Sequence, residues 1–261
     1  MIKLEAGAVH LWVTSPEDIQ DATLLETYKG FLDEDEAAQE QRFYFERHRH
    51  RYLVTHAMVR WVLSQYAECP PEDWRFSKNR YGRPEILASS AVVPPLRFNL
   101  SHAEGLAVCA VTLESDIGVD VEYLPRRADL RNIATHFFAP RECEALEGLD
   151  TDALRRLFFD IWTLKEAYIK GRGMGLAIPL DEFCFDVGPP IEMSVEETID
   201  DDPCRWRFAL LRLQTEHQIA LAVADGHGPP VMTVRRCVPC DGEQEIEEEQ
   251  WQDLRLSRPS P

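Results

Sequence analysis

The stretch "WTLKEAYIKGRGMGLAIPLDEF" (residues 162–183) combines a helical pattern with a run of glycines. Trp162, Glu166 and Lys170 are four residues apart, so in a helix they share one face. The glycines within 171–175 follow at once and let the backbone come close to another group, at an entropic cost that a simple connection would avoid. A surface ion pair would explain Glu166 and Lys170 alone, whereas the glycines beside them indicate a functional site.

The composition is that of a soluble globular protein. The chain has 261 residues, 44% of them hydrophobic and 28% charged, which is enough for one large domain or two small ones. The longest apolar run, "GLAVCAV" (105–111), has the length of a strand and cannot cross a bilayer. The N-terminus lacks a secretory signal pattern and the seven cysteines are scattered, as is typical of reduced thiols, so we expect a cytoplasmic protein without a membrane partner.

The charge of the chain is distributed unevenly. A net charge of −18 disfavours nucleic acid as a partner. Residues 41–60 nevertheless hold five arginines against one glutamate, which favours an anion site. Residues 241–261 hold seven acids against two arginines, which predicts a solvated tail, with disorder as one possibility.

Strands and helices follow one another in mixed order. Strand patterns recur after the glycines and helical patterns occur in both halves, the clearest examples being 8–14 and 96–125 for strands and 33–67 and 152–171 for helices. The hairpin-length gaps predict an α+β fold of mainly antiparallel sheets packed with helices. Because both halves share this outline, we predict two similar halves, 1–113 and 114–238, followed by the acidic tail 239–261.

The segment "GVDVEYL" (118–124) places two carboxylates on one face of a strand. Side chains alternate along a strand, so Asp120 and Glu122 point away from Val119 and Val121, about 6.6 Å apart. At an effective dielectric of about 20 their repulsion is roughly 2.5 kcal/mol. An acidic face in water is the ordinary interpretation, but a divalent cation would turn the repulsion into binding, and an all-oxygen set favours Mg²⁺ or Mn²⁺. Glu166 is the candidate third ligand.

Several residues match phosphate binding. Lys170, followed by the glycine-rich turn, fits a cation that meets anionic oxygens. In "FNLSH" (98–102), Ser101 and His102 could donate to a phosphate, although a turn-stabilising serine and a half-buried histidine are commoner. Arg83 lies beside a Tyr-Gly turn, where it is either surface charge or a further phosphate contact.

The segments "RFNLSHAEG", "IGVDVEYL" and "FFAPRECEAL", followed by the stretch quoted first, resemble 4′-phosphopantetheinyl transferases of the surfactin-synthetase-activating type. The resemblance covers about residues 30 to 225. It implies transfer of the 4′-phosphopantetheine arm of coenzyme A to a serine of an acyl or peptidyl carrier protein, with release of 3′,5′-ADP. It also implies a monomer of two similar α+β halves with the active site between them.

The resemblance implies specific roles at the magnesium site. Asp120, Glu122 and Glu166 would hold the Mg²⁺ that bridges the pyrophosphate of coenzyme A. Lys170 would neutralise pyrophosphate oxygens, with Lys165 at the neighbouring lysine of the motif.

Further roles follow from the same resemblance. Ser101 and His102 match residues that contact the phosphates of the nucleotide, and Arg83 stands where the family usually has a lysine. Glu142 matches an acidic position proposed to assist removal of the serine proton, a role for which Glu166 and a metal-bound water are the alternatives.

The stretch "DEDEAAQEQ" (33–41) departs from the family, which has lysines there for the ribose 3′-phosphate. That phosphate is then met by Arg47, Arg49, His50 or Arg51, or matters less. We prefer Arg51, which matches an arginine of the family helix.

Two other functions stay open on the residues alone. A magnesium-dependent phosphohydrolase acting on coenzyme A or a nucleotide would use water in place of the carrier serine. A non-catalytic binding module would carry the same acids as a surface face.

Overall fold

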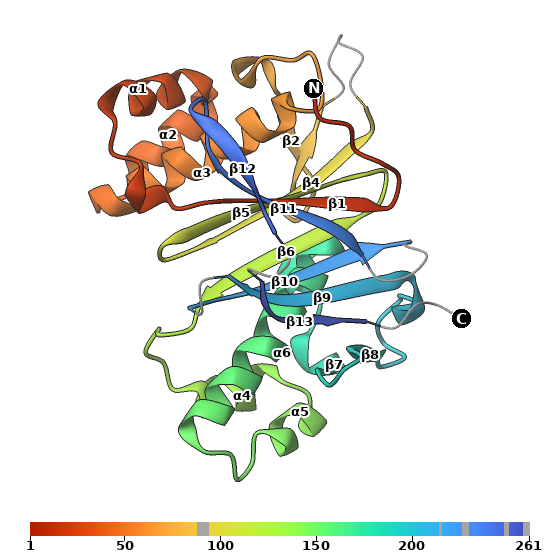
Figure 1. The fold of residues 1–261 in the computed structure, drawn as a ribbon. Coiled ribbons are helices and arrows are strands. Elements are labelled where there is room, and N and C mark those ends of the chain that lie inside the picture. Colours follow the sequence, from red (N-terminus) through yellow and green to blue (C-terminus); the bar gives the residue numbers. More distant parts are fainter. Residues whose placement is uncertain (88–93, 214–215, 226–229, 248–250, 258–261) are drawn as a thin grey trace.

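The structure, a computed structural model, describes residues 1–87, 94–213, 216–225, 230–247 and 251–257. Two β-sheets lie face to face at its centre, with helices on their outer sides (Figure 1). The first sheet has the order β12 (Gly242–Ile246), β11 (Val231–Val238), β1 (Ala8–Thr14), β5 (Leu106–Leu113), β4 (Leu96–Ala103). The second has the order β13 (Gln252–Leu256), β9 (Trp206–Leu213), β10 (His217–Ala224), β6 (Ile117–Tyr123).

Each sheet carries its own helices. The first is covered by α1 (Ala22–Phe31), α2 (Glu34–Arg42) and α3 (Glu46–Ser64), and the second by α4 (Leu130–Phe137), α5 (Pro140–Ala145) and α6 (Thr151–Gly171). Two hairpins complete the halves, β2 (Phe76–Lys78) with β3 (Pro84–Ile86) and β7 (Phe183–Asp186) with β8 (Glu192–Val195). Short 3₁₀ turns occupy Pro16–Asp18, Pro71–Asp73, Gly175–Ala177, Leu180–Glu182 and Pro203–Arg205. In the part of the chain that the structure describes, no helix combines the length and the apolar character that a membrane span needs.

The two halves repeat one topology. In the first, β1 pairs with β5 and β5 with β4, and in the second β6 pairs with β10 and β10 with β9. A long helix, α3 or α6, follows the first strand of each set. The strand pairs in the two sheets are antiparallel except for β1 with β11, which is parallel. The predicted α+β class with two similar halves is therefore confirmed.

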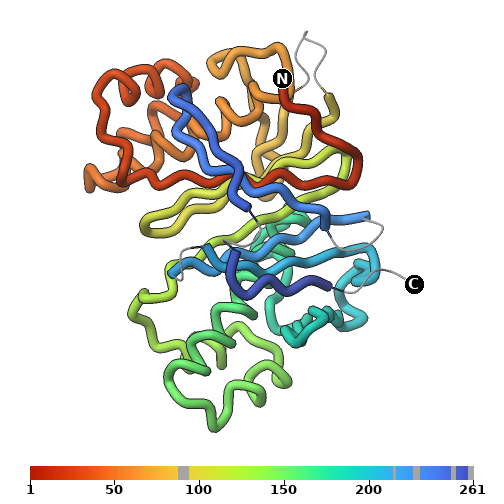
Figure 2. The backbone as a smooth tube through the Cα atoms, viewed as in Figure 1, coloured from red at the N-terminus to blue at the C-terminus, as the bar shows by residue number. Residues whose placement is uncertain are grey.

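The C-terminal segment is exposed along most of its described length, as its composition predicted, but it also forms the strands β12 and β13. Figure 2 shows the blue C-terminal chain returning beside the red N-terminal strand. Ile246 and Trp251 are buried in the core between the sheets, and Arg235 on β11 forms an ion pair with Glu245 at 2.8 Å. Arg235 of the neighbouring strand thus partly neutralises the acids of this segment, and composition alone does not reveal this partner. Residues 248–250 and 258–261 of this segment lie outside the described residues.

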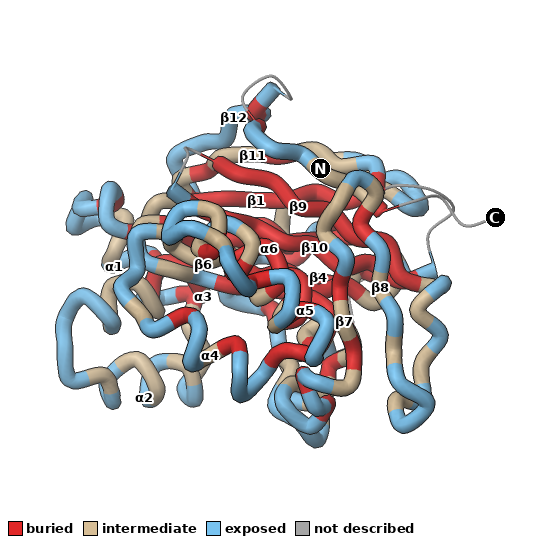
Figure 3. Tube along the Cα trace, turned by 90° about the horizontal axis from the view of Figure 1, so that it is seen from below, coloured by how far each residue is buried: buried red, intermediate tan, exposed pale blue. Residues whose placement is uncertain are grey.

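The core between the sheets is built from alternate residues of each strand. Val119 and Val121 of β6 are buried there, facing residues such as Val108 of β5. The buried strands form the centre of the molecule and the helices present exposed surfaces outward (Figure 3). Because side chains alternate, Asp120 and Glu122 point to the opposite side of β6, where α6 lies.

Candidate active site

A cleft of about 960 Å³ opens between the two halves, where β4 and β6 meet the start of α3 and the loop after β6. Six of the predicted site residues line it: Arg51, Ser101, His102, Asp120, Glu122 and Lys170. They come from four separate parts of the chain, so only the fold brings them together.

The contact between β6 and α6 sets the geometry of the cleft. A Cβ atom at Gly118 would lie 2.0 Å from the Ala167 carbonyl oxygen and 2.3 Å from the Gly171 nitrogen. Only glycine fits at position 118, and the helix packs directly on the strand backbone. The close approach that Gly171 permits is therefore to another protein segment and not to a ligand. It brings Glu166 and Lys170 against the carboxylates of β6.

Lys170 joins the two halves at the edge of the cleft. Its Nζ donates to Asp120 Oδ1 at 2.6 Å and to Ser101 Oγ at 2.9 Å, and Ser101 Oγ also donates to Asp120 Oδ1 at 2.9 Å. The second carboxylate oxygen, Asp120 Oδ2, is buried and has no hydrogen-bond partner among the described residues. A buried, unpartnered carboxylate oxygen is costly and indicates a place for a cation.

The other two acids, Glu122 and Glu166, are close enough for their charges to interact. Burial, and then the charge of Asp120, raise the pKa of Glu166 to about 7, while Lys170 opposes the rise. The pKa of Glu122 is also raised, first by burial and then by Asp120. Trp162 Nε1 donates to Glu122 Oε1 at 3.1 Å and fixes that carboxylate. The three carboxyl groups thus share one region of negative charge, which Lys170 and Arg126 offset only in part.

In the described ranges, no group of three His, Cys, Asp or Glu side chains is arranged as it stands to hold a metal ion. The ammonium of Lys170 already occupies one oxygen of Asp120. The remaining oxygen of Asp120 and the raised pKa values of Glu122 and Glu166 are the features that a divalent cation would relieve. The residues present therefore fit the predicted ion, although the structure does not show a site for it.

Basic side chains that line the cleft already interact with other groups of the protein. Burial, followed by the charges of Arg51 and Lys170, lowers the pKa of His102 to about 4, so this imidazole is neutral at pH 7. Arg51 donates through Nη2 and Nε to Glu17 Oε1 at 2.5 and 3.0 Å. A phosphate at Arg51 would have to share the guanidinium with Glu17.

Lys165 and Glu142, both predicted for the site, lie in the core and do not line the cleft. Lys165 Nζ is 2.8 Å from Glu142 Oε2 and donates to the carbonyl oxygens of Leu180 and Phe183. Neither side chain is more than 2% exposed. The structure thus separates this pair from the residues on the opposite side of α6.

Arg83 also lies away from the cleft lining, at the C-terminal end of α6. Its guanidinium donates to the carbonyl oxygens of Gly171 at 2.6 Å and Ile117 at 3.2 Å, and the side chain is 7% exposed. Asn79 Nδ2 donates to the Gly173 carbonyl at 2.7 Å. The turn before β3 therefore clamps the end of α6 onto the start of β6. Asn79 was not predicted, since only the fold shows that this turn reaches the second half.

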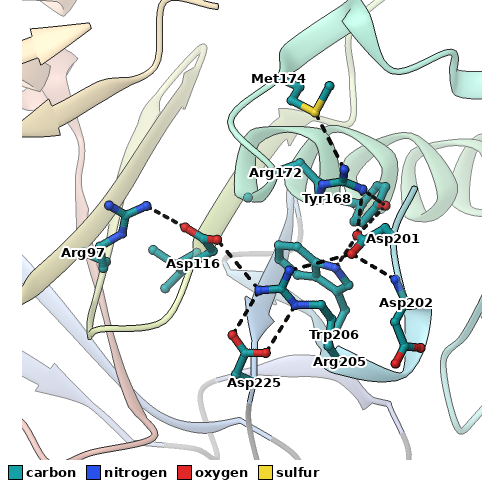
Figure 4. Close-up of polar contacts among 12 residues, drawn as sticks. Arg97, Asp116, Tyr168, Arg172, Met174, Asp201, Asp202, Arg205, Trp206 and Asp225 are labelled. Atoms are coloured by element: carbon teal, nitrogen blue, oxygen red, sulfur yellow. Dashed lines mark hydrogen bonds and ion pairs between the residues drawn. The ribbon is translucent and has the colours of Figure 1, made fainter. Parts of the chain in front are cut away.

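A second network that the sequence did not suggest holds the last turn of α6 (Figure 4). Asp201 Oδ2 accepts hydrogen bonds from Tyr168 at 2.8 Å and Trp206 at 2.7 Å, and it pairs with Arg172 at 2.8 Å. Asp201 lies in an acidic loop whose composition is that of ordinary surface, so no local pattern distinguishes it. Lys170 is thus positioned by contacts on both sides of its helix.

Known proteins match both halves of the chain. The family model of the 4′-phosphopantetheinyl transferase superfamily matches residues 116–224, and that of the 4′-phosphopantetheinyl transferase N-terminal domain matches residues 14–114. The 4′-phosphopantetheinyl transferase HetI of a Nostoc species is 37% identical over 78% of this chain and 87% of its own. The 4′-phosphopantetheinyl transferase Sfp of Bacillus subtilis is 31% identical over 69% of this chain and 77% of its own. Among solved structures, the holo-[acyl-carrier-protein] synthase of Thermotoga maritima matches 56% of this chain and 95% of its own at 17% identity, with a TM-score of 0.34, a likeness too weak to inform the fold.

A lysine beside acidic side chains, in a cleft between two halves, suits an enzyme that transfers phosphorylated groups. The extent of the matches makes the class specific: the chain belongs to the 4′-phosphopantetheinyl transferase family. The resemblance seen in the sequence is confirmed, and the alternative of a phosphohydrolase finds no support in these comparisons.

Proposed function

We propose that this enzyme transfers the 4′-phosphopantetheine arm of coenzyme A to a serine of an acyl or peptidyl carrier protein. The serine oxygen bonds to the β-phosphorus of coenzyme A, the bond from that phosphorus to the bridging oxygen breaks, and 3′,5′-ADP leaves. The observation that carries the assignment of the site is the contact of Lys170 with Asp120 and Ser101 at the cleft, in a chain of this family.

Asp120, Glu122 and Glu166 would hold a magnesium ion, with manganese as the alternative. Their oxygens are the ligands that these hard cations prefer. The buried, unpartnered oxygen of Asp120 and the raised pKa values of Glu122 and Glu166 support this role. When bound, the ion would supply positive charge for the pyrophosphate of coenzyme A.

The cleft supplies its own groups for the phosphates. Lys170 meets pyrophosphate oxygens, and Ser101, which accepts from its ammonium, keeps it pointed into the cleft. His102 is neutral at pH 7 and donates a hydrogen bond to a phosphate without adding charge. Arg51 is the candidate for the 3′-phosphate, shared with Glu17.

Glu166 is the better candidate to accept the serine proton. It lies close to Asp120 and Glu122, which line the cleft. Glu142 has both carboxylate oxygens engaged, by the Phe185 and Ala139 amides and by Lys165. We therefore assign a structural role to Glu142 and Lys165.

The deciding experiment is mass spectrometry of an apo carrier protein incubated with coenzyme A, Mg²⁺ and the enzyme. The carrier should gain the mass of one phosphopantetheine, and 3′,5′-ADP should appear only when the carrier is present. Release of 3′,5′-ADP without a carrier would contradict the proposal and favour hydrolysis. The metal assignment has a separate readout, since Mg²⁺ should raise the melting temperature of the wild type and not of Glu122→Gln.

We further propose that the enzyme acts as a monomer in the cytoplasm. Both halves of the same chain line the cleft. No disulfide joins any of the seven cysteines, all of which lie in the described ranges, and this is expected in a reducing compartment.

A further inference from the structure

The junction between α2 and α3 exposes two neighbouring aromatic rings. Tyr44 is 86% exposed and Phe45 is 53% exposed, and their rings meet edge to face at 5.0 Å. Neither ring belongs to a hydrophobic cluster of the described residues. Adjacent aromatic side chains left in water are a common mark of a binding surface.

Contacts with α3 hold the Phe45 ring and the neighbouring Phe43. The guanidinium of Arg47 lies 5.0 Å from the centre of the Phe45 ring, and Arg49 Nε donates to the Phe43 carbonyl at 2.8 Å. The Phe43 ring packs against Tyr52 of α3 at 5.4 Å. We define the aromatic–basic patch as Phe43–Phe45, Arg47 and Arg49. A surface ordered in advance loses little conformational freedom when a partner binds.

The patch is basic in a chain whose net charge is −18. Arg51, further along α3, is paired with Glu17, but within the described ranges no carboxylate lies within ion-pair distance of Arg47 or Arg49. An acidic partner is repelled by the chain as a whole and attracted here. Complementary charge of this kind guides encounter and fixes orientation.

The patch continues into the active-site cleft. The Phe45 ring lies 5.7 Å from the ring of His48, and His48 lines the cleft together with Arg126 and Arg127 of the loop after β6. A partner seated on Tyr44 and Phe45 therefore has its edge at the mouth of the cleft. The second substrate of the transfer reaction, a whole protein domain, has to approach that mouth.

We propose that the aromatic–basic patch is the docking surface for the carrier protein, and that the carrier presents an acidic face with an apolar centre to it. This inference rests on the proposed function, because it names the surface that its second substrate contacts. Tyr44 and Phe45 supply the apolar contact, and Arg47 and Arg49 supply the charge.

The test is a steady-state comparison with an acidic apo acyl carrier protein and coenzyme A as substrates. The double variant Tyr44→Ser/Phe45→Ser should raise KM for the carrier about tenfold, as loss of exposed aromatic anchors does at interfaces, and leave KM for coenzyme A and kcat within about twofold. Leu176→Ser, which removes a side chain 73% exposed outside the cleft lining, is the apolar control and should change none of these.

A charge variant tests the second half of the proposal. Arg47→Glu should raise KM for the carrier and weaken its dependence on salt, because a screened attraction has been removed. Arg156→Glu, the same charge change at an exposed arginine on α6, is the matched control. The variants should keep the circular dichroism spectrum and melting temperature of the wild type.

Three results would overturn the proposal. A raised KM for coenzyme A with an unchanged KM for the carrier would place the patch in the nucleotide site. Unchanged kinetics in every variant would leave the rings without a docking role. A wild type that modifies no carrier would remove the proposed function itself, and this failure is recognisable because it precedes any comparison of variants.

Discussion

Replacing Glu166 by glutamine should stabilise the metal-free protein at pH 8 and leave its stability unchanged near pH 4.5. Burial and the charge of Asp120 raise the pKa of Glu166 from its ordinary value of 4.5 to about 7 in the folded protein. The folded state therefore holds this proton more tightly than the unfolded state does. Its contribution to stability is fully present below pH 4.5 and is lost as pH rises towards 7.

The size of the effect follows from the two pKa values. They differ by about 2.5, and at about 1.36 kcal/mol for each pKa unit the loss between pH 4.5 and 8 is about 3 kcal/mol. Glutamine carries no charge at any pH, so the variant avoids the loss. The difference in unfolding free energy between Glu166→Gln and the wild type should thus grow from near zero at pH 4.5 to about 3 kcal/mol at pH 8.

Urea unfolding in the presence of a chelator, at several pH values between 4.5 and 8.5, measures this difference. Glu147→Gln, at an exposed glutamate of the same half, is the matched control and should show no such growth. Added Mg²⁺ should then stabilise the wild type at pH 8 and leave Glu166→Gln little changed, because the ion binds the folded state through this carboxylate. A difference between wild type and Glu166→Gln that is constant with pH would refute the reasoning.

Gly118→Ala should lower stability by at least about 1–3 kcal/mol and reduce kcat, because the new methyl group meets a backbone carbonyl of α6 at 2.0 Å. Gly30→Ala is the control and should change neither quantity, because nothing lies within 4 Å of the added methyl group. Thermal unfolding and transfer kinetics check both variants. Asp120→Ala should reduce transfer at least about a hundredfold with an unchanged far-ultraviolet spectrum, and retained activity would remove the metal assignment. Lys165→Met should cost about 3–5 kcal/mol by leaving the Glu142 carboxylate buried without its partner. The double variant Lys165→Met/Glu142→Gln should recover much of that stability and retain activity, while a stable but inactive double variant would return the pair to the chemistry.

Periodicity predicted the parts of the site that lie within single elements. The alternation of "GVDVEYL" placed Asp120 and Glu122 opposite the two buried valines, and the spacing of Glu166 and Lys170 placed both toward β6. These predictions needed only the repeat of a strand and of a helix. The family resemblance supplied the rest of the assignment, and it named residues by motif without saying which way each one faces.

The residues that sequence reasoning could not place depend on contacts between distant segments. Arg83 lies in a turn whose sequence suggests an exposed position. Only the fold shows that its guanidinium donates hydrogen bonds to the carbonyl oxygens of Gly171 and Ile117. Asp201 is one acid among several in its loop, but it alone accepts from Tyr168 and Trp206. Composition and spacing carry no information about partners so far apart in the chain.

The buried Lys165–Glu142 pair explains how α6 is rotated so that Glu166 faces β6. Consecutive residues of a helix are about 100° apart around its axis, so Lys165 and Glu166 cannot point the same way. A buried ion pair contributes little net stability, but it is strongly directional, because a small rotation would separate two desolvated charges. Fixing Lys165 against Glu142, Leu180 and Phe183 therefore fixes the rotation of the helix. The neighbouring carboxylate of Glu166 is then directed toward β6, so the core lysine determines the position of the acid next to it.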